Sequence, residues 1–197
     1  GIGIRADDDS AKGGYTGKLN DRCITVSEVL KAEGFTTAIR GKWHLTPSNR
    51  VPDDAWPTNR GFDTFWGTMT GCGTYYQPGT LTRGTENIDH EADREGFFYT
   101  DVIADQSVDF LKSHKTENPD KPYFLYVPFT APHWPLHARE KTIAEYDGVY
   151  EAGWDKLRET RLKRQKELGL LPEYLELSPR DEGVPSWENE AHKEWQV

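Results

Sequence analysis

The fold is limited most strongly by the stretch from Thr25 to Arg40, which joins a helix signal to a strand signal through one glycine. Thr25 and Glu28 form the Thr-x-x-Glu capping box that begins helices. Gly34 is a natural residue for ending one. Residues 35–39 are then rich in β-branched side chains and predict a short strand. The helical period places three apolar side chains on one face of the helix: Val26, Val29 and Leu30.

Three further segments predict elements of the same kinds. Residues 123–127 form a continuous apolar run of strand length, which predicts a buried strand. Residues 100–113 carry apolar side chains roughly on one helical face. Residues 154–168 predict a strongly charged helix that is exposed over most of its surface. Glu159 and Glu167 interrupt its basic residues, which favours a solvated face over an anion-binding patch.

Composition excludes several classes of protein. The net charge of −9 argues against nucleic-acid binding, which usually requires a basic surface. No apolar run approaches the ~20 residues that span a bilayer. Hydrophobic residues make up only 35%, but 7 Trp, 9 Tyr and 8 Phe bury large areas, so we expect a packed core. Residues 46–98 show no sustained period and predict long loops with short strands.

Polar groups follow two of the predicted strands directly. The first strand leads into Gly41–Leu45, where Lys42 and His44 alternate in a strand-like register and can point the same way. The run 123–127 leads into a stretch that contains His133. Ligands of open α/β sheets bind at the carboxyl ends of strands, so an anion would meet three nitrogen groups there. A Lys-x-His pair alone is more often incidental, and a histidine between prolines can simply cap a loop.

Three segments match a longer pattern. Gly34–Leu45 reads GFTTAIRGKWHL and resembles the sulfatase signature G-[YF]-x-T-A-x-x-G-K-W-H-L. Residues 124–135 read FLYVPFTAPHWP and resemble that family's strand followed by A-P-H-x-P. Residues 60–67 read RGFDTFWG and resemble its R-G-F-D-x-F-x-G segment. All three occur in family order, so the chain resembles a sulfatase over nearly its whole length, with an overall similarity to bacterial relatives of arylsulfatase A.

The resemblance implies an alkaline-phosphatase-like α/β fold, with a mainly parallel sheet flanked by helices and long loops. It also implies hydrolysis of sulfate esters by a formylglycine nucleophile beside a calcium ion. The family's roles map onto three residues. The lysine that contacts sulfate and neutralises its charge corresponds to Lys42. The histidine that bonds the formylglycine and acts as base when sulfate is expelled corresponds to His44. The histidine that contacts sulfate near the leaving oxygen corresponds to His133.

Parts of the family pattern are missing from this sequence. The [CS]-x-P-x-R motif that supplies the formylglycine does not occur, and neither Cys23 nor Cys72 begins it. These two cysteines are also too few for a disulfide framework. Residues 7–9 are aspartates, but they fall in the loop region after the nucleophile, so we interpret them as a solvated loop. Calcium and formylglycine are therefore expected in the full-length enzyme, with the metal ligands and the nucleophile outside this chain.

We expect residues 1–197 to be part of a single sulfatase catalytic domain, truncated at both ends and inactive alone. Gly1 is not a start methionine, and residues 189–195 resemble the opening of a helix; a processed protein with frayed ends is the alternative. Two other functions stay open: a phosphonate or phosphate monoester hydrolase of the same superfamily, and a short non-catalytic protein that binds sulfated ligands. The expected partner is a sulfate ester, and the resemblance favours the periplasm or secretion.

Overall fold

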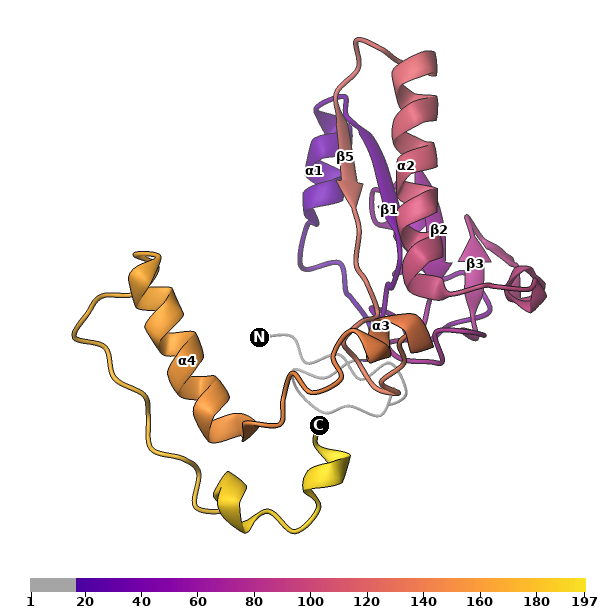
Figure 1. The fold of residues 1–197 in the computed structure, drawn as a ribbon. Helices are drawn as coiled ribbons and strands as arrows, with labels where there is room; N and C mark the ends of the chain where they lie inside the picture. The colour runs from indigo at the N-terminus through magenta and orange to yellow at the C-terminus, as the bar shows by residue number, and fades with distance from the viewer. Residues whose placement is uncertain (1–16) are drawn as a thin grey trace. The chain divides into compact units, whose positions relative to one another are not determined.

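A computed structural model describes residues 17–197 (Figure 1). The chain forms two compact units, the first ending at His137 and the second beginning at Ala138. The aspartates at residues 7–9 lie outside the described residues. The assignment of residues 1–197 to one catalytic domain stays a prediction. In the described part of the chain, no helix combines the length and the apolar character that crossing a bilayer requires.

The first unit is built on a five-stranded sheet. Its strands are β1 (Thr36–Arg40), β2 (Thr64–Thr68), β3 (Leu81–Arg83), β4 (Glu86–Asn87) and β5 (Tyr123–Tyr126). The order across the sheet is β4-β3-β2-β1-β5. β1 is parallel to both β2 and β5, whereas β3 and β4 are added in the antiparallel sense. The resemblance predicts a mainly parallel sheet. The described sheet is mixed, with three parallel strands (β2, β1 and β5) and two strands added in the antiparallel sense (β3 and β4).

Helix α1 (Val26–Ala32) begins and ends as the sequence predicts. Thr25 N–H donates to Glu28 Oε2 at 2.6 Å, and Glu28 N–H donates to Thr25 Oγ1 at 3.2 Å, which completes the capping box. Gly34 follows the helix with a φ of +88°, and β1 begins directly after the next residue. The predicted helix, turn and strand are therefore confirmed.

The buried face of α1 is polar, so the apolar face expected from the sequence is not the one that packs. Val26 is 60% exposed, whereas Ser27 is 1% exposed. Ser27 Oγ donates to the carbonyl oxygen of Arg60 at 2.7 Å. A Cβ at Gly61 would lie 2.4 Å from the backbone nitrogen of Glu28. This close backbone contact, which only glycine permits, determines which side of α1 faces the protein.

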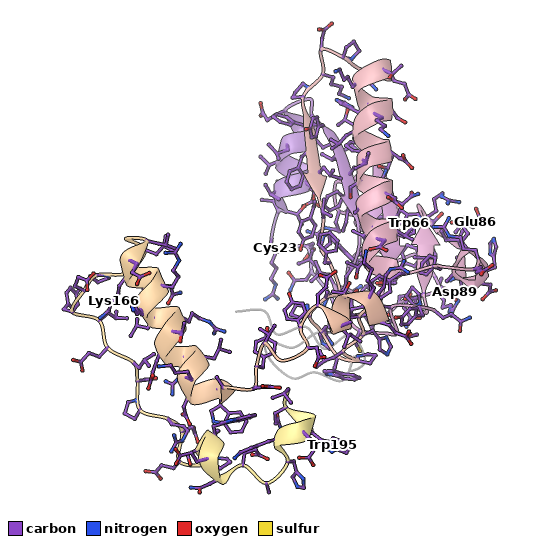
Figure 2. The ribbon with its side chains drawn as sticks, in the orientation of Figure 1. Cys23, Trp66, Glu86, Asp89, Lys166 and Trp195 are labelled. Carbon is purple, nitrogen blue, oxygen red and sulfur yellow. The ribbon has the colours of Figure 1, made fainter. Side chains whose placement is uncertain are left out.

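Helix α2 (Tyr99–Glu117) covers one face of the sheet and extends the helix predicted for residues 100–113 at both ends (Figure 1). Tyr99 of α2 lies in a buried cluster with Trp66 of β2, which is labelled in Figure 2, and their ring centroids are 5.8 Å apart. Phe65 is adjacent to Trp66 and points to the opposite face, where it belongs to a second buried cluster. The sheet is therefore packed on both faces.

Strand β5 lies at the edge of the sheet and is more exposed than its sequence predicts. Its partner among the described strands is β1, with Ala38 opposite Leu125. Tyr123 and Tyr126 are 49% and 47% exposed. The prediction of a buried strand is wrong, because a continuous apolar run indicates a strand but does not place it at the centre of a sheet.

Residues 46–98 form long loops with short strands, as the sequence predicts. This region contributes β2, β3 and β4, together with two 3-10 helices, η1 (Pro57–Asn59) and η2 (Asp89–Asp93). Pairing of β2 with β1 makes this loop-rich region part of the central sheet.

The second unit contains four short elements: α3 (Glu140–Ala144), α4 (Gly153–Glu167), η3 (Trp187–Asn189) and η4 (Lys193–Trp195). Helix α4 confirms the helix predicted for residues 154–168. Within this unit Trp154 and Trp187 pack edge to face, with ring centroids 4.9 Å apart. Asp155 Oδ2 accepts the backbone N–H of Trp187 at 2.9 Å, which fixes η3 against α4.

Basic residues of α4 form ion pairs with glutamates of the same helix. The pairs are Lys156–Glu159 at 3.3 Å, Lys163–Glu167 at 3.9 Å and Arg164–Glu167 at 3.3 Å. All of these side chains are exposed, so each pair contributes little to stability. Neutralisation of positive charge along the helix agrees with a solvated face and not with an anion-binding patch.

Candidate functional site

The carboxyl ends of β1, β2 and β5 meet in a tight junction. A Cβ at Gly41 would lie 2.1 Å from the carbonyl oxygen of Pro128, and a Cβ at Gly67 would lie 1.8 Å from the carbonyl oxygen of Gly41. Gly41 and Gly67 have φ values of +134° and +154°, which favour glycine. The three chain segments are therefore in backbone contact, and the residues that follow Gly41 leave the sheet at this edge.

The backbone of Lys42–His44 is held on both sides. On the side of β5, Lys42 N–H donates to the carbonyl oxygen of Pro128 at 2.9 Å. On the other side, Trp43 and His44 donate to carbonyl oxygens at and just after the end of β2, at 2.9 and 3.1 Å. His44 has a left-handed φ of +59°, so the predicted strand-like alternation of Lys42 and His44 ends at His44. Such a backbone persists only where the surroundings hold it, which is common at functional sites.

Trp43 anchors this segment in the core. Its side chain is 7% exposed, and Nε1–H donates to the carbonyl oxygen of Ala55 at 2.8 Å. Its ring meets Phe62 edge to face, with centroids 6.0 Å apart. Lys42 is only half-buried. The tryptophan of the G-K-W-H motif thus holds the segment, while the charged side chain before it stays out of the core.

His133 follows β5 in a turn, where its N–H donates to the carbonyl oxygen of Thr130 at 2.8 Å. Its ring nitrogen Nδ1 lies 2.8 Å from the carbonyl oxygen of Trp134. A carbonyl only accepts hydrogen bonds, so Nδ1 carries a proton. Nε2 is consequently an acceptor in the neutral ring and a donor only in the imidazolium. The ring is therefore oriented by its own backbone neighbour.

The structure brings Lys42, His44 and His133 to one end of the sheet, where the parallel strands β1, β2 and β5 have their carboxyl ends. Lys42 is bonded to the segment after β5 that leads to His133. His44 and His133 both contact the loop of residues 70–80, which connects β2 to β3. The site groups therefore follow neighbouring parallel strands, as the sequence predicts. Convergence of their side-chain nitrogens within several ångströms stays a prediction.

The R-G-F-D segment supports the fold rather than the site. The Arg60 side chain is 7% exposed, and its Nε donates to Glu28 Oε1 at 2.9 Å. Arg60 also donates to the carbonyl oxygen of Cys23 at 2.8 Å. Its hydrogen bond holds the pKa of Glu28 below the ordinary value of 4.5. Asp63 Oδ2 accepts the N–H of Thr37 at 2.9 Å, which ties this segment to β1.

Three further residues at this edge were not predicted. Gly71 lies against the ring of His44. Tyr75 donates its hydroxyl proton to the carbonyl oxygen of His133 at 2.7 Å and its N–H to Nδ1 of His137 at 3.2 Å. No local pattern marks these residues, because the partners of Tyr75 are 58 and 62 positions away along the chain.

The described residues do not fit the metal of the family. Across residues 17–197, no group of three or more His, Cys, Asp or Glu side chains comes together to hold a metal ion. Cys23 and Cys72 are free thiols, and neither stands in the motif that supplies a formylglycine. The described residues supply a fixed positive charge and two imidazoles, which suit anion binding and proton transfer.

Comparison with known protein families shows that the sulfatase family model matches residues 6–182, which is most of the chain. This chain belongs to the sulfatase family. An uncharacterized sulfatase of Schizosaccharomyces pombe is 36% identical to this sulfatase chain over 192 residues, covering 90% of the chain and 33% of the relative. The arylsulfatase of Klebsiella aerogenes is 32% identical over 193 residues, covering 94% and 38%. The sulfatase chain thus spans about a third of the length of these curated relatives.

A solved structure gives the same fold. The sulfatase chain is similar to the structure of BT4656 in complex with its substrate D-glucosamine-2-N,6-O-disulfate. The match covers 68% of the sulfatase chain and 24% of the BT4656 chain. The TM-score is 0.50 and the sequence identity is 24%. At this identity the likeness concerns the fold alone, and it confirms the predicted α/β fold.

Proposed function

We propose that this chain supplies one side of the sulfate-binding pocket of a sulfuric ester hydrolase, with Lys42, His44 and His133 facing the ester. The supporting observation is that G-K-W-H and A-P-H-W-P follow adjacent parallel strands, and that Lys42 N–H donates to the carbonyl oxygen of Pro128, which lies between β5 and A-P-H-W-P. Calcium and formylglycine would come from residues outside the described part of the chain. Location in the periplasm or outside the cell belongs to the same proposal.

Lys42 is proposed to neutralise the sulfate group. A sulfate ester carries negative charge before the reaction, and the charge shifts between its oxygens as the ester bond breaks. A lysine held at the sheet edge by its backbone is already in place for both states, so little reorganisation is needed during the reaction. Lys42 should therefore contribute to binding and to rate.

The two histidines are proposed to move protons. As imidazolium, His133 keeps Nδ1–H on the carbonyl oxygen of Trp134 and presents Nε2–H to the ester. As the bond from the bridging oxygen to sulfur breaks, sulfur would bond to the nucleophile supplied from outside the described residues. The Nε2 proton passes to the bridging oxygen, so the alcohol leaves neutral. His44 approaches from β1 and is proposed to accept a proton when sulfate is released, which gives the two rings opposite roles.

The first prediction is that Lys42→Ala weakens sulfate binding to the 197-residue chain by about ten- to a hundredfold. A hydrogen bond to a charged group is worth about 1.5–3 kcal/mol, which corresponds to that range. Sulfate is titrated at constant ionic strength, and the amide and imidazole signals are followed by NMR. The signals of Lys42, His44 and His133 should shift together along one binding curve.

Lys112→Ala is the matched control, because Lys112 is an exposed lysine on α2. It should bind sulfate as the unaltered chain does. Equal effects of the two lysine substitutions would show that sulfate affinity depends only on the net charge of the chain. That result would contradict the proposed pocket. Phosphate is titrated in parallel, since clearly tighter phosphate binding would favour the phosphate ester hydrolase over the sulfatase.

A further inference from the structure

The loop of residues 70–80 is pinned at its base. Thr70 N–H donates to Thr80 Oγ1 at 3.2 Å, and the two hydroxyl groups lie 3.0 Å apart. Met69 N–H donates to the carbonyl oxygen of Thr80 at 3.3 Å. Thr80 is only 6% exposed. The residues between these ends are therefore carried on a closed loop whose start and finish are fixed at the end of β2.

Gly71 of this loop lies against the imidazole of His44. A Cβ at Gly71 would lie 2.1, 2.2 and 2.5 Å from Cε1, Nδ1 and Cγ of the His44 ring, closer than real Cβ atoms approach. Gly71 is buried, and its φ is not among the positive values that favour glycine. The position therefore requires glycine for the space occupied by the His44 ring and not for its own backbone conformation.

Tyr75 of the same loop holds the segment that carries His133. Its hydroxyl donates to the carbonyl oxygen of His133 at 2.7 Å, and its N–H donates to Nδ1 of His137 at 3.2 Å. Burial raises the pKa of Tyr75, so the hydroxyl keeps its proton and stays a donor. The ring is 2% exposed and packs against Phe98, with centroids 6.0 Å apart.

The start of α2 fixes Tyr75 in turn. Tyr99 N–H donates to the carbonyl oxygen of Tyr75 at 2.7 Å, and Tyr99 itself is 1% exposed in the core. Tyr75 is thus bonded to the core through its carbonyl oxygen, to His137 through its N–H and to His133 through its hydroxyl. Through two backbone bonds and one side-chain bond, this residue therefore links the core to the segment after β5.

We propose that the 70–80 loop is the positioning element of the pocket, with Gly71 setting the ring of His44 and Tyr75 setting the backbone of His133. The proposal rests on the proposed function, because it assigns these contacts to the groups that face the ester. One loop then fixes the spacing of groups that arrive from β1 and from β5. Proton transfer depends on such spacing, since misplacement by ~1 Å costs about a hundredfold in rate.

The test uses the 197-residue chain with ¹⁵N-labelled histidine and four substitutions. Gly71→Ala is matched by Gly73→Ala, because a Cβ at Gly73 would meet nothing closer than an atom of Pro78 at 4.0 Å. Tyr75→Phe removes one hydroxyl and is matched by Tyr126→Phe on the exposed edge of β5. The imidazole nitrogen signals, the sulfate dissociation constant and the thermal melt are recorded for each.

We expect a crossed pattern. Gly71→Ala should move the His44 signals and leave those of His133, whereas Tyr75→Phe should move the His133 signals and leave those of His44. Loss of the single bond from Tyr75 should weaken sulfate binding about three- to tenfold. Gly71→Ala should weaken it at least as much, and both controls should behave as the unaltered chain. His90 on η2 serves as an internal reference that should not move.

Two outcomes overturn the proposal. The first is a folded Tyr75→Phe chain whose His133 signals and sulfate affinity are unchanged. The second is equal behaviour of Gly71→Ala and Gly73→Ala. If Gly71→Ala does not fold, Tyr75→Phe carries the test, because its ring packing is intact. Failure of the proposed function would give a different result. Lys42→Ala would then leave sulfate affinity unchanged, while Gly71→Ala and Tyr75→Phe would still shift the imidazole signals of His44 and His133.

Discussion

His133→Ala, in an active enzyme that contains this sequence, should slow the hydrolysis of phenyl sulfate by about 10²–10⁴-fold, the usual contribution of a positioned general acid. The loss for 4-nitrophenyl sulfate should be much smaller, because nitrophenolate is a weak base and leaves without a proton. The physical reason lies in the ring of His133, whose Nδ1–H is committed to the carbonyl oxygen of Trp134. Only Nε2 is then available to the leaving oxygen.

The measurement is kcat/KM for a series of substituted phenyl sulfates, plotted against the basicity of the leaving phenolate. The plot for His133→Ala should be steeper than the plot for the unaltered enzyme. His90→Ala, at an exposed histidine of η2, is the control and should leave the slope unchanged. A loss of equal size across the whole series would contradict the assignment of His133 as the acid.

Lys42→Ala in the same enzyme should lower kcat/KM by about 10²–10³-fold, as the loss of one preorganised contact to a charged transition state does. We expect KM to rise and kcat to fall together. Sulfate carries charge in the ground state, and that charge is redistributed in the transition state, so the lysine acts in both. Steady-state kinetics with one aryl sulfate over a wide concentration range measures the two parameters separately.

Two companion substitutions separate charge from packing at Lys42. Lys42→Met keeps the apolar stem and removes the charge, so it should lose as much rate as Lys42→Ala. Lys42→Arg keeps the charge with a different geometry and should recover only part of the rate. Full activity of Lys42→Met would show that the charge is not used. Thermal melts should be unchanged in all three variants, because the core contacts of this segment belong to Trp43.

The local part of the fold follows from the sequence. The capping box at Thr25 and Glu28, the stop at Gly34 and the strand after it depend on neighbours in the chain, so their patterns contain the necessary information. The helices at α2 and α4 follow for the same reason. Placement of Lys42 and His133 at one edge also follows, since each stands just after a strand and the strands are parallel.

The burial of particular faces does not follow from the sequence. Apolar period selects Val26 for the inner face of α1, but the bond from Ser27 to Arg60 and the contact at Gly61 turn the helix otherwise. The continuous apolar run of residues 123–127 likewise predicts a buried strand, although β5 is the outermost of the described strands. In each case the arrangement of distant segments, and not the local pattern, decides which side chains are buried.

The residues that support the site groups could not be predicted from the sequence either. His44 has a left-handed backbone that the strand-like pattern of the sequence does not predict. Its N–H bond to the carbonyl oxygen of Met69 and the close contact with Gly71 hold it there. Tyr75 carries no motif and gains its role only when residues 58 positions away lie beside it. A family signature indicates the groups that are proposed to meet the substrate, whereas the residues that contact those groups become visible only in three dimensions.

The decisive measurement is the position of a bound anion in a crystal structure of the chain grown with selenate, a sulfate analogue that selenium scattering locates. The proposed pocket requires one selenate within hydrogen-bonding distance, up to about 3.2 Å, of Lys42 Nζ and of Nε2 of His133, with the His44 ring beside it. Selenate bound elsewhere, or the His133 ring turned away from Lys42 toward the opposite side of the sheet edge, would contradict it.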